Sequence, residues 1–241
     1  MSQKCAIITK VFLEGKRGQR NAFTLIELLV VIAIIGILTS ILLPTLSRAK
    51  AKAKAIKSQS DKKQLQAAWL MATDDNGKDM LLNKPFAEGT WCTHNLGQNP
   101  KLDSRVDSQT FLKGALAPYV SGQQEMFRNP GDYHQFKNAT GIDTAAARSV
   151  ALNNKLNGVG TDAVVKLSKV RWPTETFVFI DVDTSTSDNP SFSPNFDDPG
   201  DYNGFRCSMS FVDGHAEVMR WEIGVNEIFF KGQGMPLLKL V

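Results

Sequence analysis

The feature that most constrains this chain is a run of 21 residues, from Phe23 to Leu43, in which the only ionisable side chain is Glu27. About 20 apolar residues are enough for a helix to span the hydrocarbon core of a membrane. A carboxylate in such a segment costs roughly 2.5–3.5 kcal/mol at mid-bilayer and less near the edge. A plain membrane anchor therefore explains the length of the run, whereas Glu27 needs a partner outside the lipid.

The distribution of charge separates the beginning of the chain from the rest. The net charge of the 241 residues is +4, and residues 1–22 hold five basic side chains against one acidic side chain. From Phe23 onward, basic and acidic residues are equal in number, at 23 each. One basic run, from Arg48 to Lys63, follows the apolar segment and contains no aromatic residue. A nucleic-acid-binding protein needs a basic face on its folded part, so we expect no nucleic-acid partner.

The pattern around the apolar run differs from that of a secretory signal peptide, whose apolar centre has about 7–15 residues and is followed by a small-x-small cleavage site. Here the run is longer, contains a glutamate, and has no convincing cleavage site before Pro44. A basic leader, Ala22, then Phe-Thr-Leu-Ile-Glu and an apolar run resemble the amino terminus of type IV pilins and type II secretion pseudopilins. Gly36 and Pro44 fall where that family usually has a helix-softening glycine and proline.

The resemblance implies a processing site and an assembly residue. In the family, a membrane aspartyl peptidase cleaves before the Phe and methylates the new amine, which here places the cut between Ala22 and Phe23. The family usually has Gly where this chain has Ala22, and alanine is small enough that we expect cleavage, at a lower rate. Glu27 becomes the fifth residue of the new chain, where it can pair with the Phe23 amine of a neighbouring subunit. Buried charges must be paired, and such pairs set register.

The resemblance also implies a location and partners. We expect a single-pass protein of the bacterial inner membrane, with the leader in the cytoplasm and the head in the periplasm or on an extracellular filament. The expected partners are the prepilin peptidase and methylase, other pilin-like subunits, and the secretion or pilus assembly machinery. Seven Lys and Arg residues follow the apolar run closely, against five before it, so a positive-inside count favours the opposite orientation. Recognition by the peptidase requires a cytoplasmic leader, and the resemblance therefore decides the orientation.

The predicted fold is α+β, with a long amino-terminal helix packed on an antiparallel sheet. We divide the chain into a leader (1–22), a transmembrane and assembly helix (23–43), an amphipathic helix that continues into the head (44–75), and the head itself (76–241). Pro44 interrupts the hydrogen-bond ladder of the helix. Three-and-four spacing predicts a buried face on its second half, made of Ile56, Leu65, Ala68, Trp69 and Ala72. The helix should end at Asp75-Asn76-Gly77 with a left-handed cap.

Short apolar runs in the head predict strands. They are Ser149–Leu152, Thr176–Val182, Cys207–Val212 and His215–Trp221. The last two flank Asp213-Gly214, a strong hairpin signal. Phe111–Val120 predicts a short helix that ends near Pro118, and Thr184–Asn203 predicts a long polar loop.

A second resemblance concerns the head. Phe211–Glu217, with Asp213, Gly214 and His215, matches the end of a motif of pilin-like proteins that consists of His, nine residues and Asp-Gly. This chain has Asn203 in place of the motif histidine. Phe127–Asp132 resembles a second block, usually written with Cys-Pro, in which Asn129 replaces the cysteine. Roles assigned to the histidine and the cysteine therefore do not transfer to this chain.

Catalytic and metal sites have weaker support in the sequence. Four residues at the ends of predicted strands could converge, and they are Asp181, Asp183, Asp213 and His215. Asp also favours turns and strand ends, and we prefer that structural interpretation. The long loop supplies hard oxygen ligands suited to Ca²⁺, from Asp188, Asp197, Asp198 and Asp201, without a fixed ligand spacing. No phosphate loop, Gly-x-Ser-x-Gly elbow or Cys-x-x-Cys is present, so we do not expect an enzyme.

Two further questions stay open at this stage. Cys92 and Cys207 would remain after removal of the leader, and they can form a disulfide in an oxidising compartment or stay reduced. The alternative function is a binding module, anchored in the membrane or displayed on a fibre, that captures a glycan or another polymer. Exposure of Trp91 or Trp172 would favour this module, and a third class, an anchored hydrolase, requires the carboxylate and histidine cluster to converge.

Overall fold

The computed structural model describes residues 24–84, 87, 89–92, 112–138, 140–158, 163–187, 190–193, 197–202, 206–223 and 228–230. The leader, Ala22, Phe23 and Asn203 lie outside these residues. The chain divides into two compact units, Met1–Leu46 and Ser47–Val241.

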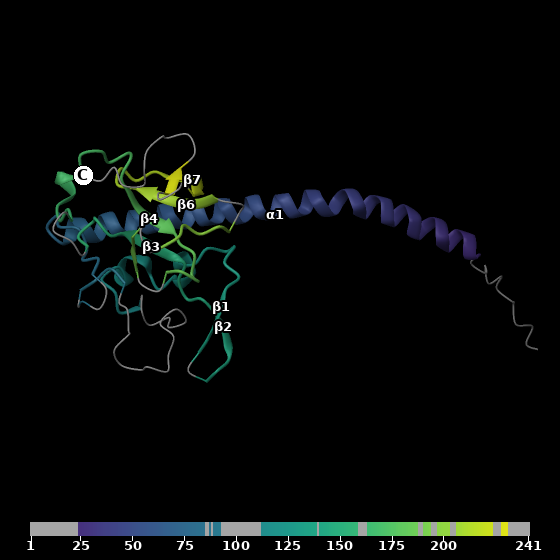
Figure 1. Ribbon diagram of the computed structural model, residues 1–241, viewed down its shortest axis with the longest axis horizontal. Coiled ribbons are helices and arrows are strands. Elements are labelled where there is room, and N and C mark those ends of the chain that lie inside the picture. The colour runs from purple at the N-terminus through teal and green to yellow at the C-terminus, as the bar shows by residue number, and fades with distance from the viewer. Residues whose placement is uncertain are drawn as a thin grey trace, which may run out of the picture. The chain divides into compact units, whose positions relative to one another are not determined.

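One long helix, α1, runs from Leu25 to Asp75 and continues through Pro44 (Figure 1). The predicted continuation of the helix past the proline is therefore confirmed. Beyond its last residue, Gly77 and Lys78 have left-handed backbone angles, with φ of 67° and 69°. The amide of Lys78 donates to the carbonyl of Thr73 at 2.9 Å, which closes the helix in the way predicted from the glycine.

The head contains a six-stranded sheet with the order β5-β3-β4-β6-β7-β8, and Figure 1 shows β3, β4 and β6 beside the second half of α1. The strands are β3 (Val150–Asn153), β4 (Phe177–Asp181), β5 (Ser191–Phe192), β6 (Arg206–Phe211), β7 (Ala216–Ile223) and β8 (Ile228–Phe230). A separate antiparallel pair consists of β1 (Gln135–Lys137) and β2 (Asp143–Ala145). Three short 3₁₀ helices are η2 (Ala117–Val120), η3 (Gln124–Phe127) and η4 (Leu167–Lys169). The α+β prediction is confirmed.

The sheet differs from the prediction in one pairing, because β5 lies parallel to β3. β5 belongs to the segment predicted as a loop. The amide of Leu152 donates to Pro190 at 2.9 Å, and that of Asn154 donates to Phe192 at 3.1 Å. The pairing comes from backbone hydrogen bonds to β3, which the polar composition of the segment does not reveal.

The other predicted strands are present, within one or two residues of their expected bounds. All five residues of β4 are buried, as expected for a central strand. The β6–β7 hairpin is also present, but four residues, 212–215, separate the two strands instead of two. Phe211 exchanges hydrogen bonds around the loop, since its carbonyl accepts from Gly214 and its amide donates to His215, both at 2.9 Å. Gly214 has a φ of 95°, a conformation that glycine adopts without strain.

Of the predicted helix Phe111–Val120, Phe111 lies outside the described residues and Leu112 is helical. Residues 113–116 form turns and a bend, and the 3₁₀ helix η2 begins at Ala117, so the described part is not one continuous helix. Pro118 lies in the first positions of η2 instead of ending a helix. Proline fits at that point because the first amides of a helix have no partner within the helix.

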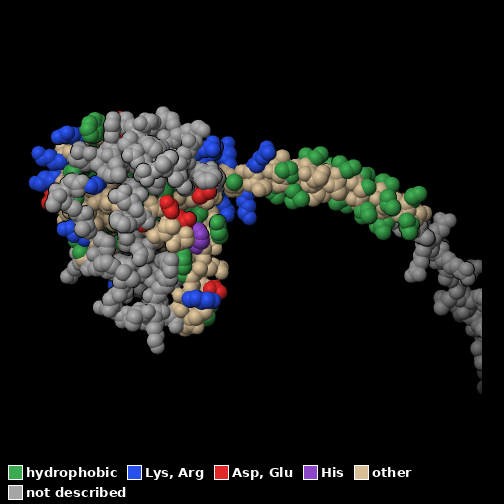
Figure 2. All heavy atoms as spheres, in the orientation of Figure 1, with side chains coloured by type: hydrophobic (Ala, Val, Ile, Leu, Met, Phe, Trp, Pro, Cys, Tyr) green, Lys and Arg blue, Asp and Glu red, His purple; other side chains and the backbone are tan. Residues whose placement is uncertain are grey.

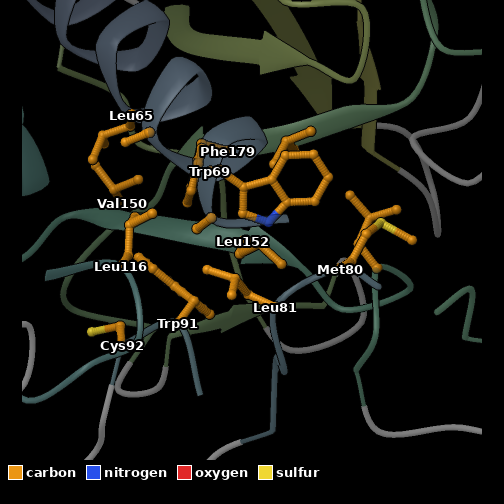
Figure 3. Close-up of a cluster of buried hydrophobic side chains, with 14 of the residues drawn as sticks. Leu65, Trp69, Met80, Leu81, Trp91, Cys92, Leu116, Val150, Leu152 and Phe179 are labelled. Atoms are coloured by element: carbon orange, nitrogen blue, oxygen red, sulfur yellow. The ribbon is translucent and has the colours of Figure 1, made fainter. Parts of the chain in front are cut away.

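The main hydrophobic core joins α1 to one face of the sheet. Leu65 and Trp69 are fully buried and pack near Val150, Leu152 and Phe179 (Figure 3). Ala68 and Ala72 are buried beside them, as predicted.

Ile56 does not belong to the buried face, since its side chain is 56 % exposed. It precedes Leu65 by nine residues, which is about two and a half turns of an α-helix and places it on the opposite side. The buried face begins instead at Ser58.

We predict that Trp69→Ala lowers the free energy of unfolding by about 3–5 kcal/mol, because it empties a large, fully buried volume. Urea unfolding of the full chain in detergent, followed by tryptophan fluorescence and circular dichroism, measures the change. Met71→Ala is the matched control on the same helix, since Met71 is 52 % exposed, and its effect should stay within about 0.5 kcal/mol. Equal losses in the two variants would contradict the assignment of Trp69 to the core.

Candidate assembly segment and buried anchor

The first half of α1 exposes apolar side chains along its length (Figure 2). Between Leu25 and Leu46, its large hydrophobic side chains are 45–80 % exposed. Among the described residues, α1 is the one helix long and apolar enough to cross a membrane. An apolar surface of this extent has to face lipid or other apolar helices.

The hydroxyl groups of this segment are satisfied within the helix. Thr39 donates to the carbonyl of Ile35, Ser40 to that of Ile37 at 2.7 Å, and Thr45 to that of Leu42 at 2.8 Å. Polar groups that bond to their own helix need no water. The segment is therefore compatible with lipid on every face.

Glu27 forms a capping box with Thr24, at the start of the helix. The carboxylate oxygen Oε2 accepts from the Thr24 amide at 2.9 Å and from its hydroxyl at 2.8 Å, and the Glu27 amide donates to Thr24 Oγ1 at 3.2 Å. This motif was not among the predictions, although Thr-x-x-Glu before an apolar run is its signature. Both bonds to the carboxylate end on Oε2, and within the described part of the chain Oε1 accepts none. Glu27 thus has a local partner and still has an oxygen for a second one.

The other predicted residues of this segment are placed in part. Ala22 and Phe23 lie outside the described residues. Gly36 lies within α1, and apart from its chain neighbours and the backbone of its own helix, no atom lies within 4 Å of the position of a Cβ. An approaching helix therefore meets no side chain there. The roles of Glu27, Gly36 and Pro44 in assembly stay predictions.

A buried polar network, here called the anchor, holds the second half of α1 to the head. It consists of Ser58, Lys62, Asn129, Asp181 and Ser208. The ammonium Nζ of Lys62 lies 2.6 Å from Asp181 Oδ1, and both side chains are at most 1 % exposed. Oδ2 of Asp181 accepts from Ser58 at 2.9 Å, from Asn129 Nδ2 at 2.7 Å and from the Ser208 amide at 3.0 Å. One carboxylate of β4 thereby joins α1, β6 and the loop after η3.

Asn129 makes further bonds in the anchor. Its side-chain oxygen Oδ1 accepts from the backbone amide of Gly131, and its backbone amide donates to Ser149 Oγ, both at 2.7 Å. A Cβ on Gly131 would lie 2.8 Å from the Cβ of Tyr202, so the close approach requires glycine. The block Phe127–Asp132 therefore has a structural role in this chain with asparagine at its third position.

Two glutamines extend the polar contacts of α1 along the sheet. Gln66 Oε1 accepts from Ser210 Oγ at 3.2 Å, and Gln59 Nε2 donates to the carbonyl of Ala216 at 2.6 Å. Lys62 was not predicted as a buried residue, because it lies in the basic run from Arg48 to Lys63. Its spacing from Leu65 and Trp69, of three and seven residues, was the signal that placed it on the buried face.

The carboxylates considered for catalysis have separate structural partners. Asp181 belongs to the anchor, Asp183 accepts from the Ser185 amide at 2.8 Å, and Asp213 lies 2.5 Å from Nδ1 of His215. The rings of His215 and Phe211 are stacked, with their centroids 4.2 Å apart. The part of the chain that the structure describes holds no group of three or more His, Cys, Asp or Glu residues suited to a metal ion. The cluster that a hydrolase requires is not formed there.

The calcium prediction for the long loop stays untested. Asp188 lies outside the described residues, and Asp197 is buried with its carboxylate accepting from the Ser193 amide at 2.7 Å. Asp197 thus has a local structural partner.

The two cysteines lie in different hydrophobic clusters, Cys92 with Trp91 and Cys207 with Met209. The structure contains no disulfide between these two residues. Burial raises the pKa of the Cys207 thiol well above its usual value, which disfavours the reactive thiolate.

The two tryptophans considered for ligand binding differ in exposure. Trp91 is fully buried, and its indole donates to Asn83 Oδ1 at 3.1 Å. Trp172 is 43 % exposed. Only Trp172 therefore meets the condition set for a binding surface.

Comparison with known proteins gives one family match, at the amino-terminal end, and one similar curated protein. Residues 17–43 match the family described as the prokaryotic N-terminal methylation motif. The type II secretion system core protein G of Aeromonas hydrophila is 40 % identical over 80 residues, which cover 30 % of this chain and 56 % of that protein. The chain thus spans about half the length of the curated relative that it matches. No solved structure matches the chain. The predicted resemblance to the pilin and pseudopilin family is confirmed.

We predict that Asp181→Asn lowers the free energy of unfolding by about 3–5 kcal/mol, because it leaves the buried ammonium of Lys62 without a counter-charge. Denaturant unfolding of the full chain measures the loss. Asp183→Asn, two residues along the chain and partly exposed, is the matched control and should change stability by about 0.5 kcal/mol or less. A loss in Asp181→Asn no larger than that of the control would show that the ion pair does not hold α1.

Proposed function

We propose that this chain, whose first segment carries the prokaryotic N-terminal methylation motif, is a structural subunit of the pseudopilin kind that assembles through the first half of α1. The observation that carries the proposal is an apolar helical surface, exposed on all sides, with Glu27 as its one ionisable group. The similarity to a type II secretion core protein supports a secretion pseudopilus over a surface pilus.

The proposed maturation begins in the inner membrane. The prepilin peptidase removes residues 1–22 and methylates the amine of Phe23, and the helix stays in the bilayer as a single span with the head on the periplasmic side. A positive amine then lies four residues before Glu27. The capping box fixes the carboxylate at the start of the helix, where its Oε1 can accept from the Phe23 amine of a neighbouring subunit.

Assembly then replaces lipid with neighbouring helices around the Phe23–Leu43 segment. Apolar contact provides little preference for one register, because lipid is as apolar as the helices. A buried charge pair provides that preference, since each misaligned register leaves two charges unpaired. Glu27 is therefore proposed as the residue that sets the stagger between subunits.

A second role, as a displayed binding module, rests on the half-exposed indole of Trp172. Aromatic side chains at a surface can bind sugars or other polymers through their apolar faces. Trp91 gives no support, because it belongs to the core. Display on a filament is compatible with the structural role, and we place it second.

We predict that Glu27→Leu inserts into the membrane but forms no filaments, because the neighbouring Phe23 amine loses its partner. Membrane fractionation and electron microscopy of cells that express the assembly machinery measure the two properties. Thr24→Ala is the comparison variant, since it removes the hydroxyl of the capping box and keeps the charge, and it should still assemble. Normal filaments from Glu27→Leu would overturn the proposal, and failure of both variants would assign Glu27 to helix capping alone.

We predict that the mature protein begins at N-methylated Phe23. Mass spectrometry of the amino-terminal peptide, in cells with and without the peptidase, checks the site. Ala22→Gly should be processed at least as fast as the natural chain, and Ala22→Leu should remain uncut because the site needs a small residue. A mature end elsewhere in the chain would contradict the proposed maturation.

A further inference from the structure

We propose that Lys62 and Asn129 form an intramolecular amide cross-link, with Asp181 as the group that carries the proton between them. The three side chains are buried, with exposures of 0 %, 1 % and 0 %. Asp181 contacts both partners through different oxygens. Oδ1 lies 2.6 Å from Lys62 Nζ, and Oδ2 accepts from Asn129 Nδ2 at 2.7 Å.

The ion pair alone leaves the ammonium poorly satisfied. Within the described residues, neither Lys62 Nζ nor Asp181 Oδ1 has a partner in hydrogen-bonding geometry, although the two atoms lie close together. A buried ammonium costs several kcal/mol unless it is paired and fully hydrogen-bonded. The proposed reaction begins with transfer of one proton from Nζ to Oδ1, which gives an amine and a carboxylic acid. The resulting amine is a nucleophile.

The side-chain amide of Asn129 is arranged as the acceptor of this attack. Its Oδ1 receives a hydrogen bond from the Gly131 amide at 2.7 Å, and such a donor stabilises the negative charge that develops on the oxygen of a tetrahedral intermediate. Its Nδ2, the leaving nitrogen, contacts Asp181 Oδ2, from which it can take a proton. The anchor therefore holds a nucleophile, a proton carrier and an activated amide together.

The reaction balances without an oxidant or a co-reactant. The bond between Lys62 Nζ and Asn129 Cγ forms, and the bond between Cγ and Nδ2 breaks. One proton of Nζ passes through Asp181 to Nδ2, which leaves as ammonia and takes the second proton of the former ammonium to become an ammonium ion. Asp181 returns to its ionised form.

The leaving group has a route to solvent. A cavity of about 290 Å³ lies beside Asn129 and is lined by charged side chains. Two of them, Lys57 and Asp61, come from α1, and Arg128 and Asp132 come from the loop after η3. A polar cavity can hold water and accept an ammonium ion.

The cross-link would join α1 to a loop 67 residues further along the chain. A covalent bond at this position keeps the helix attached to the head when force is applied to either part. The chemistry is independent of the proposed function, although a filament subunit loaded through α1 would gain most from it.

The test is mass spectrometry of tryptic peptides from the full chain, purified in detergent. The cross-link predicts a peptide that joins residues 58–63 to residues 129–137, with a mass about 17 Da below the sum of the two, because ammonia is lost. Separate peptides of unmodified mass would overturn the proposal. A link from Lys62 to Asp181, which loses water instead, would overturn it as well.

Variants identify the role of each group. Lys62→Met and Asp181→Asn should give separate peptides, because the first lacks the nucleophile and the second lacks the proton carrier. Lys52→Gln, ten residues earlier on α1 and exposed, is the matched control and should keep the joined peptide, because trypsin still cuts after Lys57. Asn129→Asp should give the same joined peptide with loss of water. A joined peptide in Asp181→Asn at the natural yield would remove Asp181 from the mechanism, and the natural chain gives a decisive result even where a variant does not fold.

Discussion

The carboxylate of Asp181 is the interaction on which the head depends. It lies at the end of the central strand β4, is fully buried, and accepts from α1, from β6 and from the loop after η3. Its counter-charge, Lys62, comes from α1. Hydrophobic contacts at Leu65 and Trp69 stabilise the packing by burying apolar surface, but they are not directional. The charge and its hydrogen bonds fix which turn of the helix meets which strand, and this makes the same site suited to a covalent bond.

The two halves of α1 meet different requirements with one continuous helix. In the first half the hydroxyls of Ser40 and Thr45 bond within the helix. The capping box holds the carboxylate of Glu27 through Oε2 and leaves Oε1 for a second partner. The second half has a buried face that begins with polar residues, Ser58, Asp61 and Lys62, and continues with mostly apolar ones from Leu65 onward. One helix thus has two parts with different properties: an apolar first half long enough to span a membrane and a second half that packs on the head.

Much of the fold could be predicted because it follows from local patterns. The apolar run, the central strand and the β6–β7 hairpin each depend on composition and spacing within one short segment of the chain. Ile56 was assigned to the wrong face because the spacing to Leu65 was not followed over several turns. The strand β5 was missed because its pairing rests on the backbone of β3. The capping box of Thr24 and Glu27 was visible in the sequence and was overlooked.

The sequence by itself determined the membrane-length helix, the position of its single carboxylate, and the resemblance that the methylation motif confirms. These properties depend on side chains that are neighbours along one helix. Only the tertiary structure decided that Lys62, Asn129 and Asp181 share one buried site, and that Cys92 and Cys207 lie in different clusters. Lys62, Asn129 and Asp181 are 52 to 119 residues apart in the sequence. No local pattern encodes that contact, because it follows from the packing of a helix, two strands and a loop around one charge.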